Sequence, residues 1–246
     1  MRVIFDPKLP GPVNMGRDES LLEFVRQGRS PTTLRFYGWT VPTISLGASQ
    51  PWHQYLDLNG PVAGLSVVRR RTGGGAILHD AELTYSLTIR KEQSPEGSFG
   101  EVYRLVQEAI VATLCDLGLP TTLRPRGAAA GPIAQRDTFW CFHREYDYDI
   151  MVAGQKMGGS AQRRVPDALL QHGSIMLRRT FDQHPGTTMD AFMEPVSIEE
   201  LASRLTRKIE ACLNMKAQAG TWRDEELKRA EPLTAEHEAM SWLDRR

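Results

Sequence analysis

The alternation of apolar and polar positions predicts a chain rich in short strands. Segments of β-branched and aromatic residues, bounded by Gly, Pro or polar clusters, are typical of strands. Two of them would be joined by a turn at Pro42, and two others would flank a run of glycines. The expected strands are residues 2–5, 34–39, 43–46, 65–70, 76–79, 83–89, 139–142, 148–152, 155–163 and 169–177.

Apolar residues that recur every three to four positions predict three helices. The first begins at Asn14. The most regular one covers residues 99–117 and is stopped by Gly118, and the third covers 198–213. A stretch of small, uncharged residues at 127–135 is typical of a mobile loop.

Strands interleaved with helices predict an α/β (α+β) fold, in which a mixed β-sheet is flanked by helices. The length suits one domain over residues 1–246, and its last part, from about 197 to 246, would be helical. We expect a monomer.

The charge balance gives no reason to expect nucleic acid or a membrane as a partner. Lys+Arg and Asp+Glu both number 30, so the formal net charge is zero. The sequence has neither a signal-peptide pattern at its start nor a run of apolar residues long enough to span a bilayer, so we expect a cytoplasmic protein. Its cysteines, Cys115, Cys141 and Cys212, form no C-x-x-C pair, which argues against a disulfide framework or a metal site.

Three consecutive glycines, Gly73, Gly74 and Gly75, stand between two expected strands. Glycine weakens a strand, but it lets the backbone approach a ligand closely and present N–H donors to it. The preceding Arg70 and Arg71 could contact a phosphate. A plain hairpin turn with surface arginines would leave the same pattern.

Lys156 precedes a run of small residues that would leave a groove open: Gly159, Ser160 and Ala161. Such a lysine could donate to a substrate carbonyl, although most lone lysines beside turns are surface residues. Cys141, between aromatic residues, is by itself more typical of a buried, inert core cysteine. His172 could be a base, a ligand or a hydrogen-bonded core residue.

Taken in order, these motifs resemble one family. The succession R-R-x-x-G-G-G-A-x-x-H-D, G-x-K-x-x-G-S-A-Q and Q-H-G-S-I is similar to the lipoate–protein ligase and octanoyltransferase group of the biotin/lipoate ligase superfamily. The resemblance covers roughly residues 11–180. It implies attachment of an eight-carbon acyl chain to a lysine of a lipoyl-carrier domain, such as glycine cleavage H protein or a dehydrogenase acyltransferase subunit.

Two reactions occur in this group. Ligases activate free lipoate with ATP and Mg²⁺, whereas octanoyltransferases take octanoate from acyl carrier protein through a cysteine thioester and need no cofactor. One transferase branch has a C-F-x-x-x-x-x-Y-[DE] segment ahead of the lysine motif, and Cys141-Phe142 followed by Tyr148-Asp149 matches it. The resemblance therefore favours the transferase. An ATP-dependent ligase and a non-catalytic acyl- or carrier-binding relative are the alternatives.

The resemblance also implies a role for each motif. Cys141 would carry the acyl group, and Lys156 would hold its carbonyl oxygen and favour the thiolate. The glycine run would let the acyl chain or pantetheine arm lie against the backbone. The remaining expected substrate contacts are Arg70 and Arg71 to phosphate, His79 and Asp80 fixing the loop, Gly159, Ser160 and Ala161 along the groove, and His172 and Gly173 along the acyl tunnel.

Overall fold

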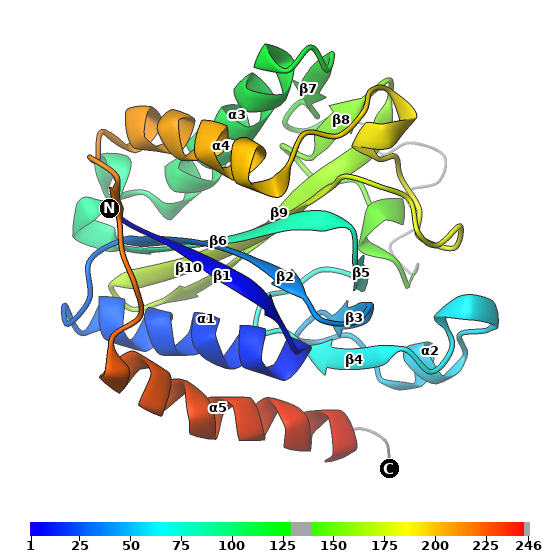
Figure 1. Ribbon diagram of the computed structural model, residues 1–246, viewed down its shortest axis with the longest axis horizontal. Coiled ribbons are helices and arrows are strands. Elements are labelled where there is room, and N and C mark those ends of the chain that lie inside the picture. The colour runs from blue at the N-terminus through cyan, green and yellow to red at the C-terminus, as the bar shows by residue number, and fades with distance from the viewer. Residues whose placement is uncertain (129–138, 244–246) are drawn as a thin grey trace.

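A large mixed sheet runs through the computed structural model, which describes residues 1–128 and 139–243 (Figure 1). Within these residues, eight strands follow the order β11-β1-β2-β6-β10-β9-β8-β7. β1 pairs in parallel with β2 and β11, and the other neighbours pair antiparallel. The strands are β1 (Arg2–Leu9), β2 (Thr33–Trp39), β6 (Glu82–Arg90), β7 (Thr121–Leu123), β8 (Ile150–Val152), β9 (Gln155–Val165), β10 (Ala168–Met176) and β11 (Gln218–Ala219).

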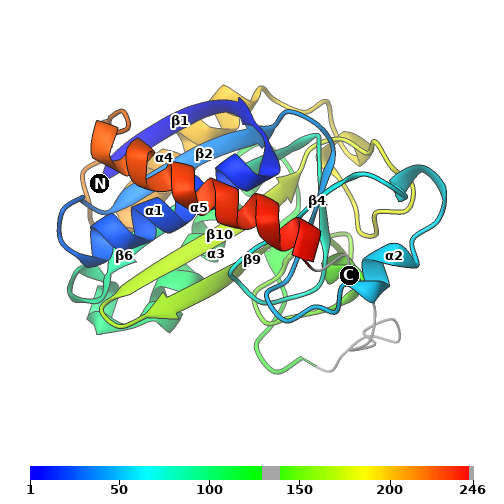
Figure 2. The ribbon, with the colours of Figure 1, turned by 90° about the horizontal axis from the view of Figure 1, so that it is seen from below.

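Helices cover both faces of this sheet, which confirms the predicted fold class (Figures 1 and 2). α1 (Gly11–Arg26) lies against one face and is itself covered by α5 (Asp224–Leu243). α3 (Phe99–Asp116) and α4 (Ile198–Leu213) lie side by side on the opposite face. Of the helices that the structure describes, none combines the length and the apolar character needed to cross a membrane.

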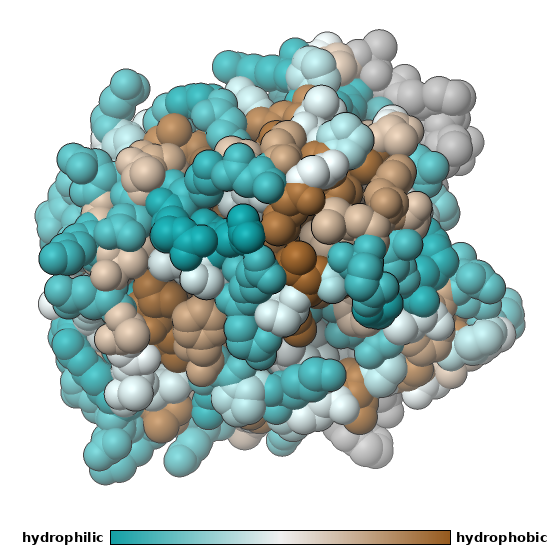
Figure 3. Space-filling view, turned by 45° about the horizontal axis from the view of Figure 1, so that its top comes forward, coloured by the Kyte–Doolittle hydropathy of each residue, from teal (hydrophilic) through white to brown (hydrophobic). Residues whose placement is uncertain are grey.

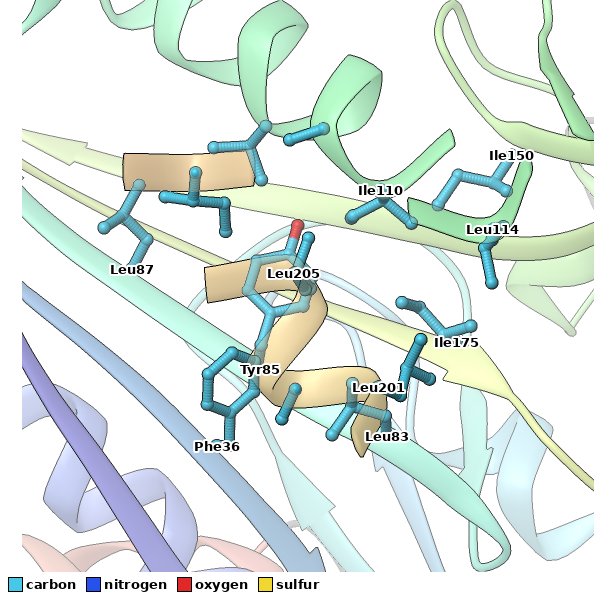
Figure 4. Close-up of a cluster of buried hydrophobic side chains, with 14 of the residues drawn as sticks. Phe36, Leu83, Tyr85, Leu87, Ile110, Leu114, Ile150, Ile175, Leu201 and Leu205 are labelled. Atoms are coloured by element: carbon cyan, nitrogen blue, oxygen red, sulfur yellow. The ribbon is translucent and has the colours of Figure 1, made fainter. Parts of the chain in front are cut away.

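The main hydrophobic core fills the space between the sheet and the α3–α4 layer. Figure 4 shows Leu201 and Leu205 of α4 beside Leu83 and Tyr85 of β6, with side chains of α3 next to them. Burial of these apolar side chains holds the layer to the sheet. The face of the molecule that carries this layer shows patches of hydrophobic residues between hydrophilic ones (Figure 3).

The helix ends follow local rules, with one correction to the expected boundaries. Ser98 caps α3 by accepting from the backbone N–H of Glu101 at 3.2 Å. α1 begins at Gly11, three positions before the predicted Asn14. Pro12 explains the earlier start, because its fixed φ suits the first helical turn, where its missing N–H costs no hydrogen bond.

A second sheet has three strands in the described residues, in the order β4-β3-β5. These are β3 (Thr43–Leu46), β4 (Ser66–Arg69) and β5 (Ile77–His79), and a short helix, α2 (His53–Leu56), lies between β3 and β4 in the chain. The segments on either side of Pro42 are both strands as expected, but they belong to different sheets. β4 and β5 flank β3, so the glycine run crosses the end of β3.

The predicted strand at residues 139–142 is wrong. Trp140 forms a single bridge with Ala76, and Cys141–His143 is a 3-10 helix. The bridge is limited to two backbone hydrogen bonds between Ala76 and the segment from Phe139 to Cys141, both 2.8 Å long. Most of the loop expected at residues 127–135 lies outside the described residues.

We expect Leu205→Ala to lower the free energy of unfolding by about 2–5 kcal/mol, because it opens a cavity in the core. Leu205 is fully buried between α4 and the sheet. Leu56→Ala is the matched control, since that side chain is 60% exposed. Urea denaturation measures both changes. Equal effects of the two substitutions would contradict this account of the core.

Candidate active site

A cleft of about 990 Å³ opens between the two sheets. Its walls come from β9 and β10, from the small sheet, from the start of α3 and from the segment after residue 139. One part of the lining is aromatic and apolar, with Met15, Tyr37, Trp39 and Ile77. The cleft therefore offers an apolar wall and a group of polar side chains in one space.

Cys141 lies in this cleft at the start of its 3-10 helix, with its side chain half-buried. The Cys141 backbone N–H donates to the Ala76 carbonyl at 2.8 Å, which ties the cysteine to the small sheet. A Cβ added to Gly75 would come within 2.8 Å of the Cys141 nitrogen. The glycine run is thus packed directly against the backbone of the cysteine.

Lys156 comes from β9 and is 4% exposed. Its Nζ lies 2.8 Å from Asp149 Oδ2 and donates to the backbone carbonyls of Arg144 at 3.2 Å and Cys141 at 3.4 Å. Asp149 is itself held by the Tyr146 backbone N–H at 2.8 Å. Lys156 therefore anchors the segment that carries the cysteine.

The environment keeps Lys156 charged. Burial by itself would lower the pKa of Lys156, but the negative charges of Asp149 and of a Cys141 thiolate outweigh it and raise that pKa above its ordinary value. Lys156 thus places a buried positive charge beside Cys141.

Arg70 holds the glycine run from beneath and is 3% exposed. Its Nη2 donates to the carbonyls of Gly73 at 2.8 Å and Gly75 at 2.7 Å, and its Nη1 donates to the Ser45 carbonyl at 2.7 Å. Nη1 also donates to Ser45 Oγ, and Nε to Thr72 Oγ1, each at 3.2 Å. These contacts use all five N–H donors of the guanidinium, so Arg70 organises the loop instead of offering free donors to the cleft.

The glycine run has unused donors of its own. Gly73 and Gly74 line the cleft, and Gly74 has a φ of 100°, a conformation that favours glycine. Within the described residues, the backbone N–H groups of Gly73, Gly74 and Gly75 donate no hydrogen bond. Those of Gly73 and Gly74, the two glycines that line the cleft, could donate to a bound oxygen.

His79 is buried at the small sheet and stacks on Trp39, with ring centroids 4.0 Å apart. Its Nδ1 is 2.6 Å from Glu82 Oε1, and its Nε2 is 2.6 Å from Ser45 Oγ. Burial would raise the pKa of Glu82, but the contacts with His79 and two hydroxyl groups lower it below its ordinary value, so Glu82 is a carboxylate.

His172 of β10 has a similar pair of partners. Its Nε2 is 2.6 Å from Thr72 Oγ1, and its Nδ1 is 3.6 Å from Asp18 Oδ2. Burial lowers the pKa of His172 below its ordinary value, although Asp18 opposes the shift. The imidazole is therefore neutral over most of the pH range in which proteins work.

Asp18 is fixed by a buried cation. Arg35, which is fully buried, donates to Asp18 Oδ1 and to Asp6 Oδ2, both at 2.7 Å. Tyr37 and Ser86 also donate to Asp18, at 3.1 and 2.7 Å. Burial would raise the pKa of Asp18, but Arg35 and the hydrogen bonds lower it, so a carboxylate persists beneath the cleft.

Small residues on β9 and β10 keep the cleft open. Gly159, Ser160 and Ala161 line it as the sequence predicts. A Cβ on Gly159 would come within 3.0 Å of Lys156 Cε, and one on Gly173 within 2.4 Å of Ser160 Oγ. Side chains at these two positions would displace the lysine and the serine.

The structure brings most of the predicted site residues together. Those that line the cleft are Arg70, Gly73, Gly74, His79, Cys141, Lys156, Gly159, Ser160, Ala161, His172 and Gly173. Gly75 packs behind Cys141. Two predicted residues lie elsewhere: Arg71 pairs with Glu19 of α1 and Glu236 of α5, and Asp80 borders a separate small cavity beside Met176 and Arg179.

Several residues that shape the site escaped the sequence analysis. Asp149 stands in the motif that pointed to Cys141, and that position could have been singled out. Asp18 looks like an ordinary acidic residue early in a helix. Ser45 and Thr72 give no signal, because hydroxyl side chains in and beside strands are common.

The chain matches known proteins along most of its length. The model of the lipoyl protein ligase A/B catalytic domain matches residues 10–212. Octanoyltransferase LipM of Kyrpidia tusciae is 34% identical over 98% of this chain and 97% of that protein. Octanoyltransferase LipM of Symbiobacterium thermophilum is 42% identical over 68% of this chain and 62% of that protein.

The fold agrees with these sequence matches. A solved bipartite lipoate protein ligase from Thermoplasma acidophilum, studied with its E2 lipoyl domain, has a TM-score of 0.71 at 20% identity and covers 95% of this chain and 91% of that chain. The long family match and the near full-length relative lead to one conclusion: this chain belongs to the lipoyl protein ligase A/B catalytic domain family.

Proposed function

We propose that this protein is an octanoyltransferase that serves protein lipoylation. It takes the octanoyl group of octanoyl-acyl carrier protein onto Cys141 and passes it to a lysine of a lipoyl-carrier domain. The observation that carries the proposal is a half-buried thiol in a cleft, with two buried cations, Lys156 and Arg70, beside it. The similarity to octanoyltransferases supports the octanoyl group as the acyl chain.

In the first step, Cys141 Sγ attacks the thioester carbonyl carbon of the donor. A carbon–sulfur bond forms to Cys141, the bond to the donor sulfur breaks, and the carrier thiol leaves with a proton. The tetrahedral oxygen needs donors as charge develops on it. Lys156 can turn an N–H to it by giving up its longest contact, 3.4 Å to the Cys141 carbonyl, and the unused N–H groups of the glycine run supply others.

In the second step, the amine of the carrier lysine attacks the acyl-cysteine. The amide bond forms, Cys141 sulfur leaves, and the amine loses a proton. Thioester exchange is nearly balanced in free energy and amide formation is favourable, so the sequence of steps requires neither ATP nor a metal ion. The apolar wall at Met15, Trp39 and Ile77 suits an eight-carbon chain.

The expected acceptor is a folded lipoyl-carrier domain that presents one lysine. The solved relative from T. acidophilum was studied with an E2 lipoyl domain, which makes this class of acceptor the first one to test. Glycine cleavage H protein is the other candidate acceptor. The cleft is open to solvent, which leaves an approach for such a lysine.

We expect octanoyl-acyl carrier protein, without ATP, to leave one octanoyl group on the protein, detectable by intact mass. Cys141→Ala should abolish the adduct because it removes the attacking sulfur. Cys115→Ala is the matched control, since that cysteine is exposed on the outer side of α3. Absence of an adduct together with lipoate-dependent ATP–pyrophosphate exchange would identify a ligase and contradict the proposal. If neither the adduct nor the exchange is detected and the protein still binds the carrier, the result would indicate a non-catalytic relative.

We expect Lys156→Gln to lower the rate of octanoyl transfer by about 10²–10³, the usual cost of losing one oxyanion donor. A single-turnover assay from octanoyl-acyl carrier protein to a lipoyl domain measures the rate. Lys208→Gln is the control, because that lysine forms an ion pair with Asp116 on the surface of α4. An equal loss of transfer rate in both variants would show that positive charge in general, and not the lysine in the cleft, supports octanoyl transfer.

A further inference from the structure

Two chains of hydrogen-bonding groups in the same order meet beneath the glycine run. In the first chain, the Asp18 carboxylate faces His172 Nδ1, and His172 Nε2 is 2.6 Å from the Thr72 hydroxyl. In the second, the Glu82 carboxylate lies 2.6 Å from His79 Nδ1, and His79 Nε2 is 2.6 Å from the Ser45 hydroxyl. We call them the Thr72 relay and the Ser45 relay.

Both relays end on Arg70. Its Nε donates to Thr72 Oγ1 and its Nη1 to Ser45 Oγ, each at 3.2 Å. The remaining donors hold the carbonyls of Ser45, Gly73 and Gly75. The guanidinium is therefore fixed by a hydroxyl on either side, and it in turn fixes both ends of the glycine run.

Counting donors and acceptors assigns the protons. A guanidinium only donates, so both hydroxyl oxygens accept from Arg70. A carboxylate only accepts, so each histidine carries a proton on Nδ1, toward Asp18 in one relay and toward Glu82 in the other. His172 is neutral, so its Nε2 is an acceptor and the Thr72 hydroxyl sends its proton to it.

We propose that Ser45 and Thr72 are positioning residues, which hold Arg70 and through it the glycine run against Cys141. The role in catalysis rests on the proposed function, whereas the hold on the loop does not. Deletion of either hydroxyl leaves one Arg70 N–H and one histidine Nε2 without a partner in a buried space. Gly75 then loses the support that keeps it within contact distance of the cysteine backbone.

The order hydroxyl, histidine, carboxylate is also that of a serine-hydrolase triad, but neither hydroxyl is placed to act as a nucleophile. Ser45 is fully buried and Thr72 is 1% exposed. The oxygen of each already accepts from Arg70, whereas Cys141 is half-buried and faces the cleft. The acyl group therefore belongs on the cysteine.

We expect Thr72→Val to raise the hydrogen–deuterium exchange of the Arg70 and Ala76 amides, which donate to the Leu46 and Phe139 carbonyls at the two ends of the loop, by about tenfold, the factor that corresponds to one ordinary hydrogen bond. The same variant should lower kcat for octanoyl transfer and leave KM for the donor nearly unchanged. Thr72→Ser keeps the hydroxyl and should restore both values. Ser45→Ala should behave like Thr72→Val.

The matched control is Thr113→Val, because Thr113 is also 1% exposed but bonds within α3 to the Ala109 carbonyl. Thermal unfolding confirms that each variant is folded. Unchanged exchange of the Arg70 and Ala76 amides in folded Thr72→Val and Ser45→Ala, or an octanoyl group found on Ser45, would overturn the proposal. If the wild-type protein forms no octanoyl adduct while Thr72→Val still loosens the loop, the proposed function fails and the positioning role stands.

The relays also predict the effect of acid. Protonation of His172 turns Nε2 into a donor, so the Thr72 hydroxyl loses its acceptor. The titratable and charged groups that face His172 are Asp18 from α1, Arg70 at the end of β4 and His79 from β5, with Arg35 of β2 and Glu82 of β6 behind them. The folded pKa of His172 lies below its unfolded value, so its neutral form stabilises the fold above pH ~6.5 and this stability is lost as pH falls.

We therefore expect protection of the Arg70 and Ala76 amides from exchange to fall in mild acid, once exchange rates are corrected for the intrinsic effect of pH. Thr72→Val should flatten this dependence, because its loop is already loosened at neutral pH. A wild-type loop whose protection is independent of pH below ~6.5 would contradict the proton assignment.

Discussion

The arrangement of the site depends on one buried guanidinium. Arg70 lies under the glycine run, and within the described residues no carboxylate forms an ion pair with it. Carbonyl and hydroxyl oxygens take its hydrogen bonds but do not neutralise its charge. Burial lowers the pKa of Arg70, and a thiolate at Cys141 opposes that shift. The same thiolate raises the pKa of Lys156. Lys156 is paired with Asp149, so Arg70 is the buried cation for which one negative charge in the cleft is the natural complement.

Two carboxylates of the site, Asp18 and Glu82, are separated from Arg70 by a histidine and a hydroxyl. Asp149 lines the cleft and is paired with Lys156 instead. This separation has an electrostatic purpose. A carboxylate in contact with Arg70 would neutralise it and leave less attraction for a thiolate or for an oxygen on which charge develops. The histidines lie between these carboxylates and the hydroxyls, so neither carboxylate pairs with Arg70.

The sequence predicts where strands and helices lie better than it predicts which strands pair. Alternation located six of the eight strands described in the large sheet, because it reports which side chains are buried, and it missed the short β7 and β11. A helical period located α3 and α4 for the same reason. Burial does not say which strand lies beside which. The strands around Pro42 therefore looked like neighbours, although β2 pairs with β6 and β3 with β4. At residues 139–142 aromatic residues imitate a strand, but they pack around the 3-10 helix that carries the cysteine.

The order of the motifs predicted the site, and the errors in that prediction have a geometric cause. Arg70 and Arg71 are adjacent where β4 ends, and adjacent residues of an extended chain point to opposite sides. One therefore enters the cleft and the other pairs with α1 and α5. Ser45 and Thr72 could not be found in this way, because their importance comes from lying on either side of Arg70 in space. Such a role depends on tertiary contacts, and no local pattern encodes it.

Glycine is what lets these separate contacts act on a single thiol. A Cβ at Gly47 would lie 2.0 Å from the Gly74 carbonyl oxygen, and one at Gly75 would strike the backbone of Cys141. The glycine run is thus pressed between the end of β3 and the cysteine segment, with Arg70 below it. The packing leaves no free volume at these contacts, so a displacement of one group also displaces the group packed against it. The buried hydroxyls of Ser45 and Thr72 are thus linked to the Cys141 segment through the hydrogen bonds of Arg70 and the packing of Gly75, although neither touches the thiol.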